Sequence, residues 1–122
     1  MAKTILIVDD SSSLRSVVGT ALKGAGYDVI EAEDGKDALT KLNGQKIHLI
    51  ISDVNMPNMN GLEFLKASKQ IPAYKFTPVI MLTTESAEEK KMQGQAGGAK
   101  AWMVKPFQPP QLLNAVSKLV LP

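Results

Sequence analysis

Short apolar runs alternate with longer amphipathic segments along the chain, and this alternation constrains the fold more than any other feature. The runs are rich in β-branched residues and bounded by polar residues or glycine, a pattern that predicts buried β-strands. We expect five strands, at Thr4–Val8, Asp28–Ala32, Ile47–Ile51, Pro78–Leu82 and Ala101–Val104. The second of these should be less buried than the others.

The segments between and after the runs carry apolar residues at helical spacing. Leu14, Val17, Val18 and Leu22 follow the i, i+3, i+4 pattern, so this helix has one apolar face. Helix starts are predicted at Ser11 or Ser12, at Asp34, after the loop 53–60, at Ser86 (a helix that runs to Ala96), and at Pro109 and Pro110. Five β-α units indicate an α/β fold, a doubly wound parallel sheet with five helices.

The length of 122 residues fits one domain, 1–122, and the last predicted helix runs almost to Pro122, so we expect no output domain. The absence of cysteine excludes disulfides and thiolate metal sites. A net charge of +2 with dispersed lysines gives no signal for nucleic acid. No apolar run is long enough for membrane insertion, and we expect a cytoplasmic protein.

Polar residues follow four of the predicted strands. Ligands of parallel α/β sheets bind outside the carboxyl ends of the strands. The residues at these ends are Asp9 and Asp10, Asp53, Thr83 and Thr84, and Lys105. If the first and third strands are neighbours, three carboxylates converge, and they cannot all stay ionised without a cation. An all-oxygen acidic cluster suits Mg²⁺.

Such a pocket favours a phosphoryl group. Lys105 could neutralise one phosphoryl oxygen, Thr83 could donate a hydrogen bond to another, and an aspartate can form an acyl phosphate. Each of these residues also has an alternative without a function in chemistry. Asp9 and Asp10 could form a strand-to-helix turn, Lys105 could be a surface lysine, and Thr83 could be a hydroxyl at the end of a strand. We interpret His48, the only histidine, as structural or partly exposed. The sequence has no Gly-rich phosphate-binding loop, so nucleotide binding is not indicated.

Four short motifs occur in the order DD, SDVNMP, LTTE and KPF. Together they closely resemble the receiver domain of two-component response regulators, in particular free-standing chemotaxis receivers of the CheY type. The resemblance covers essentially the whole chain. It implies the strand order 2-1-3-4-5, with Asp53 as the phosphoacceptor and a sensor histidine kinase as the phosphodonor.

The resemblance also implies roles for the matching positions around Asp53. Mg²⁺ would be bound by Asp10, Asp53 and the backbone carbonyl of Asn55, with Asp9 acting partly through water. Lys105 would contact the phosphoryl group, and its bond to Pro106 is expected to be cis.

Further positions correspond to the switch. Thr83 resembles the switch hydroxyl, and Thr84 would offer its backbone N–H to the phosphoryl group. Asn55 and Glu85 match the positions that tune dephosphorylation. Trp102 takes the place of an aromatic residue that rotates inward as the switch Thr moves, and the larger indole should be harder to fit inward.

Two helices depart from the motor-binding pattern of this family. The fourth predicted helix opens with Ser86, Ala87, Glu88 and Glu89, and the last offers Asn114 and Ala115, where motor-binding receivers tend to present basic residues. Because charge selects partners, these changes disfavour the flagellar motor as the target.

We therefore expect a monomeric switch that signals by protein contact and is no turnover enzyme. The alternatives are a phosphate sink, a pseudo-receiver that never takes phosphate, and an aspartyl phosphatase, which would usually carry D-x-D on its first strand.

Overall fold

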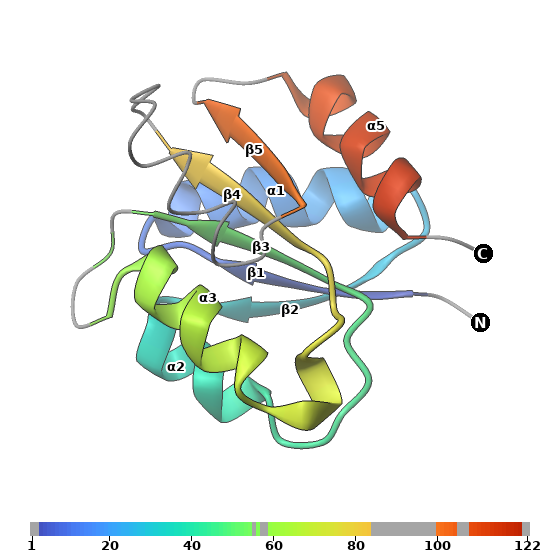
Figure 1. The fold of residues 1–122 in the computed structure, drawn as a ribbon. Helices are drawn as coiled ribbons and strands as arrows, with labels where there is room; N and C mark the ends of the chain where they lie inside the picture. The colour runs from blue at the N-terminus through green and yellow to red at the C-terminus, as the bar shows by residue number, and fades with distance from the viewer. Residues whose placement is uncertain (1–2, 55, 57–58, 84–99, 105–107, 121–122) are drawn as a thin grey trace.

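A five-stranded parallel sheet forms the centre of the molecule (Figure 1). The computed structural model describes residues 3–54, 56, 59–83, 100–104 and 108–120. The strands are β1 (Thr4–Val8), β2 (Asp28–Ala32), β3 (Leu49–Asp53), β4 (Val79–Thr83) and β5 (Ala101–Val104). Their order in the sheet is β2-β1-β3-β4-β5, which confirms the expected fold class and strand order.

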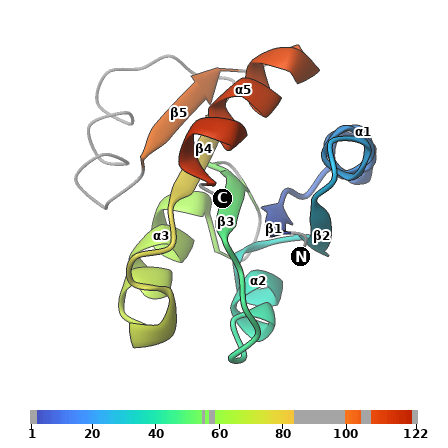
Figure 2. The same ribbon diagram turned by 90° about the vertical axis from the view of Figure 1, so that its right-hand side faces the viewer.

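Helices cover both faces of the sheet (Figures 1 and 2). They are α1 (Ser12–Gly24), α2 (Gly35–Lys41), α3 (Gly61–Lys69), the 3₁₀ helix η1 (Pro72–Tyr74) and α5 (Pro109–Leu119). Four α-helices thus lie in the described part of the chain, and the helix predicted from Ser86 to Ala96 lies outside it. None of the described helices has the length and hydropathy needed to cross a bilayer.

Alternating side chains of the strands build two separate cores. Leu6, Ile50 and Met81 point to the face that α2 and α3 cover, where Phe64 and Leu65 of α3 are buried. Their strand neighbours point to the face that α1 and α5 cover, where the core contains Ile7, Ile51, Leu82, Leu22 and Val116. Strands β1 and β3 are therefore buried on both faces, whereas β2 at the sheet edge is only partly buried, as predicted.

Side-chain caps fix where the helices begin. Ser11 Oγ accepts the Leu14 N–H and starts α1, and Asp34 Oδ1 accepts the Asp37 N–H and starts α2, which confirms both predicted caps. At the other end of α1, Gly26 takes a positive φ of 97°, a conformation that glycine adopts without strain.

Strands β3 and β4 begin and end later in the chain than predicted. Strand β3 begins at Leu49, two residues later than predicted, because the imidazole Nδ1 of His48 accepts the Thr4 N–H at 3.0 Å in place of a backbone carbonyl. It continues through Asp53, which pairs with Leu82 of β4. Strand β4 begins at Val79, one residue later than predicted, because Pro78 has no N–H to donate. Asp53 is therefore the last residue of a buried strand and is held by the sheet itself.

Candidate functional site

Three aspartates meet where β1 and β3 end. These strands are paired in parallel, so Asp9, directly after β1, comes close to Asp53, the last residue of β3. Asp9, Asp10 and Asp53 each offer a carboxylate oxygen, and these three atoms lie within 4.8 Å of one another. Asp9 and Asp53 are only 1% and 6% exposed, whereas Asp10 is exposed. The predicted convergence of the three carboxylates is present.

Backbone and side-chain hydrogen bonds hold Asp9 in place. Its N–H donates to the Ala32 carbonyl, and its Oδ1 accepts the Ser11 N–H at 2.8 Å. Its backbone carbonyl accepts a hydrogen bond from Nη1 of Arg15, whose Nε lies 3.2 Å from a carboxylate oxygen of Glu31. Residue 9 is therefore fixed between the end of β2 and the first turn of α1.

Asp53 is fixed from the opposite direction. Its Oδ1 accepts the N–H of Val54 at 2.9 Å. The Val54 carbonyl in turn accepts the N–H of Gly61, the first residue of α3. This contact brings Gly61 so close that a β-carbon there would lie 2.0 Å from the backbone oxygen of Asp53. The start of α3 thus packs directly against the backbone of the phosphoacceptor candidate, and only glycine fits there.

The donor set of this cluster fits a hard divalent cation. Mg²⁺ binds oxygen ligands at about 2.1 Å, so opposite ligands lie about 4.2 Å apart. The three carboxylate oxygens, within 4.8 Å of one another, need only a small adjustment to share one ion. With one face exposed at Asp10, waters can complete an octahedron.

The other residues predicted for the site divide into two groups. Thr83 ends β4, the strand next to β3, and pairs with Val104 of β5, so its backbone lies at the same end of the sheet as the aspartates. The Thr83 side chain is outside the described part of the chain, as are the residues Asn55, Thr84, Glu85, Lys105 and Pro106. Their predicted roles, including the cis bond before Pro106, stay predictions.

Trp102 packs with the core between the sheet and the helices α2 and α3. It lies opposite Met81 in the pairing of β4 with β5, and its side chain is partly buried. Its indole Nε1 is fully buried and has no hydrogen-bond partner among the described residues. The indole therefore packs against the core in this arrangement, and the expectation that an inward rotation is harder for so large a ring stays a prediction.

His48 is structural, as interpreted from the sequence. Its Nδ1 accepts the Thr4 backbone N–H, and the backbone N–H of His48 donates to the Thr4 carbonyl at 2.8 Å. Burial and the nearby charges of Lys3 and Lys46 hold the pKa of His48 below its ordinary value. The neutral imidazole that accepts from Thr4 is therefore the favoured form.

Three residues that support the site were missed from the sequence. Arg15 and Gly61 give no signal in a single sequence, because their partners are 6 and 8 residues away and meet them only in the fold. Asn60 did have a signal. The spacing of Asn60 and Glu63 is that of a capping box, and each side chain accepts the N–H of the other residue at the start of α3.

Comparison with known proteins gives consistent results. The family model of the response regulator receiver domain matches residues 5–117. Chemotaxis protein CheY1 of Helicobacter pylori is 39% identical over 119 residues, which cover 96% of this chain and 95% of CheY1. The crystallised chemotaxis protein CheY4 of Vibrio cholerae superimposes with a TM-score of 0.94 at 49% identity, covering 98% of this chain and 99% of CheY4.

A longer relative matches as well. The alkaline phosphatase synthesis transcriptional regulatory protein PhoP of Bacillus subtilis is 40% identical over 121 residues. These residues are 99% of this chain but 49% of PhoP, so the chain spans about half the length of that relative.

Proposed function

The chain belongs to the family of response regulator receiver domains, and we propose that it works as a phosphorylation-activated switch in a chemotaxis-type two-component system. Asp53 would accept a phosphoryl group from a sensor histidine kinase. The observation that supports this most is the meeting of Asp9, Asp10 and Asp53, with their oxygens within 4.8 Å. A signalling domain of this family is no catalyst of external substrates.

The transfer forms one bond and breaks one. A carboxylate oxygen of Asp53 attacks the phosphorus of a phosphohistidine on the kinase, and the phosphorus–nitrogen bond breaks. The imidazole leaves with the electron pair and takes up a proton, while Asp53 becomes an acyl phosphate. The hydrogen bond from Val54 to Oδ1 orients the carboxylate for this attack.

The metal in this proposal is Mg²⁺. Asp10, Asp53 and the backbone carbonyl of Asn55 would hold it, and Asp9 would act partly through water. When bound, the ion offsets the charge of the converging carboxylates and of the phosphoryl oxygens. The position of Asp9 is set by Ser11 and Arg15, so the acidic edge of the site is preorganised.

The remaining predicted residues would complete the phosphoryl pocket. Lys105 and the backbone N–H of Thr84 would contact phosphoryl oxygens, and the hydroxyl of Thr83 would move toward them. Asn55 and Glu85 would set how fast water reaches the acyl phosphate. Trp102 would respond to the movement of Thr83, so that phosphorylation shifts the population of two arrangements of this surface.

The output would be contact with another protein. The residues Asn114 and Ala115, exposed and half-buried on α5, do not provide the basic surface of a motor-binding receiver, so we propose a target other than the flagellar motor. A pseudo-receiver is less favoured, because the acidic cluster is complete. The cytoplasmic location, the monomeric state and the absence of an output domain stay predictions.

Trp102, the only tryptophan, gives a direct test of the switch. Beryllofluoride with Mg²⁺ mimics an aspartyl phosphate, and it should change the fluorescence of Trp102 saturably in the wild type. Asp53→Ala should abolish the change, and so should omission of Mg²⁺. An equal response in the Asp53→Ala variant would show that the signal does not come from the proposed site.

A further inference from the structure

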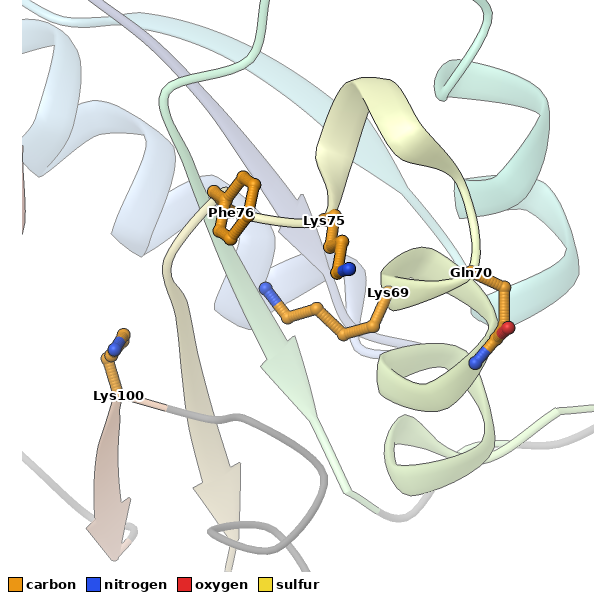
Figure 3. A pocket seen from close by; sticks show the side chains of 5 residues that line it. All are labelled: Lys69, Gln70, Lys75, Phe76 and Lys100. Carbon is orange, nitrogen blue, oxygen red and sulfur yellow. The ribbon is translucent and has the colours of Figure 1, made fainter.

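A basic hollow lies at the end of the sheet opposite the aspartates. Its volume is about 460 Å³, and it is lined by Lys69 at the end of α3, by Gln70 directly after it, by Lys75 and Phe76 before β4, and by Lys100 before β5 (Figure 3). The backbone N–H of Lys100 donates to the Val79 carbonyl, which places the hollow where β4 begins. A five-residue strand such as β4 spans about 13 Å, so the hollow is separate from the site where β1 and β3 end.

The charged side chains that line the hollow are all lysines. Burial and the neighbouring charge of Lys100 lower the pKa of Lys69. Within the described part of the chain, no ion pair joins Lys69, Lys75 or Lys100 to a carboxylate. Lys69 Nζ donates instead to the backbone carbonyl of Thr77. The three ammonium groups therefore create a positive potential that no described carboxylate in the hollow offsets, and a negatively charged ligand complements it.

Phe76 adds an apolar element to this basic surface. It is 87% exposed, the most exposed large hydrophobic residue in the described part of the chain. The segment that carries it is well anchored, because Tyr74 is 3% exposed and its hydroxyl donates to the Gln45 carbonyl and accepts the Gly44 N–H. On the other side, Val79 is fully buried. The fold thus holds the ring in solvent, and its only described ring contact is with the Lys75 ammonium, 5.7 Å from its centroid.

An exposed aromatic ring within a charged rim has the composition of a protein-binding surface. A compact phosphate is a poorer match, because it cannot reach lysines on three separate segments at once and has no apolar group to cover Phe76. Carboxylates spread along a peptide can reach the separate lysines, and an apolar side chain can cover Phe76.

We propose that the hollow formed by Lys69, Lys75, Phe76 and Lys100 docks an acidic segment of a partner protein that carries an apolar side chain. The carboxylates of the segment pair with the three lysines, and its apolar side chain packs on Phe76. This site does not depend on phosphorylation of Asp53, and a partner can occupy it in either state of the switch.

The test is an NMR titration of the ¹⁵N-labelled full chain with two acetylated and amidated pentapeptides, Glu-Glu-Phe-Glu-Glu and Glu-Glu-Ser-Glu-Glu, and with inorganic tripolyphosphate. We expect the Phe peptide to bind saturably at low salt and to shift amides at 69–70, 75–77 and 100. The Ser peptide should bind about tenfold more weakly, because it lacks the side chain that covers Phe76.

Two pairs of variants test the site, and each pair makes the same kind of change once in the hollow and once on α1. Phe76→Ser should lower the affinity for the Phe peptide about tenfold. Val17→Ser, which removes an apolar residue that is 57% exposed on α1, should leave that affinity unchanged. Lys75→Gln should lower the affinity for the Phe peptide about threefold, whereas Lys23→Gln at the exposed end of α1 should leave it unchanged.

Three results would overturn the proposal. The first is the absence of saturable shifts at the hollow with millimolar Phe peptide. The second is an equal loss in Lys75→Gln and Lys23→Gln, which would indicate non-specific attraction. The third is tighter binding of tripolyphosphate that Phe76→Ser leaves unchanged, which would identify a small-anion site. None of these results depends on whether Asp53 takes a phosphoryl group.

Discussion

Gly61 packs against the backbone of Asp53 so tightly that a β-carbon at position 61 would lie 2.0 Å from the Asp53 carbonyl oxygen. The same hypothetical atom would lie 2.9 Å from Cε of Met81. The methionine end can move, but the strand backbone cannot move without disturbing β3. The start of α3 and the candidate phosphoacceptor are therefore placed by a single contact.

Gly61→Ala should lower the free energy of unfolding by about 3 kcal/mol, because relief of the overlap must displace α3 or the end of β3. It should also slow phosphorylation, since Asp53 moves with its backbone. Urea unfolding and the rate of labelling by a small acyl phosphate measure the two effects. Gly24→Ala is the matched control, because its β-carbon meets nothing within 4 Å and alanine is the better helix former. Wild-type stability in Gly61→Ala would show that the contact is looser than described.

Repulsion among the three carboxylates should be visible without metal. Asp10→Asn removes one charge from the cluster, so the metal-free variant should be more stable than the wild type at low salt. The wild type should gain about 2.7 kcal/mol at a Mg²⁺ concentration of about 100 times Kd, and Asp10→Asn much less.

Thermal unfolding with and without Mg²⁺ measures both effects. Asp28→Asn, an exposed residue where β2 begins, is the control and should keep the full response to Mg²⁺. A variant of Asp10 that responds to Mg²⁺ like the wild type would remove this residue from the metal site.

His48 should make stability depend on pH. Its pKa in the folded protein is below the ordinary value of 6.5, so the unfolded chain binds the proton more readily. Stability from this residue is present above about pH 6.5 and is lost as the pH falls toward the folded pKa. Protonation also removes the lone pair that accepts the Thr4 N–H.

The variant His48→Asn can still offer an acceptor to Thr4 but does not titrate. Urea unfolding at about pH 7.5 and pH 5.5 should show a smaller loss of stability in the variant than in the wild type. Identical losses would mean that other groups cause the pH dependence.

Trp102 carries a buried indole N–H without a described hydrogen-bond partner, and such a donor lowers stability. Trp102→Phe removes the donor and keeps most of the ring. Its free energy of unfolding should be within about 1 kcal/mol of the wild type, whereas Trp102→Ala should cost about 3 kcal/mol through lost packing. Urea unfolding followed by circular dichroism measures both. A loss in Trp102→Phe as large as in Trp102→Ala would show that the N–H makes a hydrogen bond that matters.

The strands and the acidic site were predictable because their signals are local. Thr4–Val8 and Asp28–Ala32 have the predicted bounds, since each run is bounded by residues of different character. The convergence of Asp9, Asp10 and Asp53 was predictable because the carboxyl ends of parallel strands lie at the same edge of the sheet. The start of β3 was not predictable, because the Thr4 N–H is accepted by the imidazole of His48 and not by a backbone carbonyl.

Contacts that form only in the folded chain account for the other features that were missed. The Arg15 guanidinium and Gly61 meet the site only after folding. The hollow around Phe76 likewise combines residues of three segments, α3, the turn before β4 and the start of β5, that no sequence pattern links.

The most direct measurement is the intact mass of the protein after incubation with Mg²⁺ and a small acyl phosphate donor, with Asp53→Ala alongside. We predict one added phosphoryl group on the wild type, none on Asp53→Ala and none without Mg²⁺. A control receiver that is labelled under the same conditions shows that the donor is active. If the wild type then stays unlabelled and Trp102 fluorescence does not respond to beryllofluoride, the switch function is contradicted. Labelling of Asp53→Ala would contradict the assignment of Asp53.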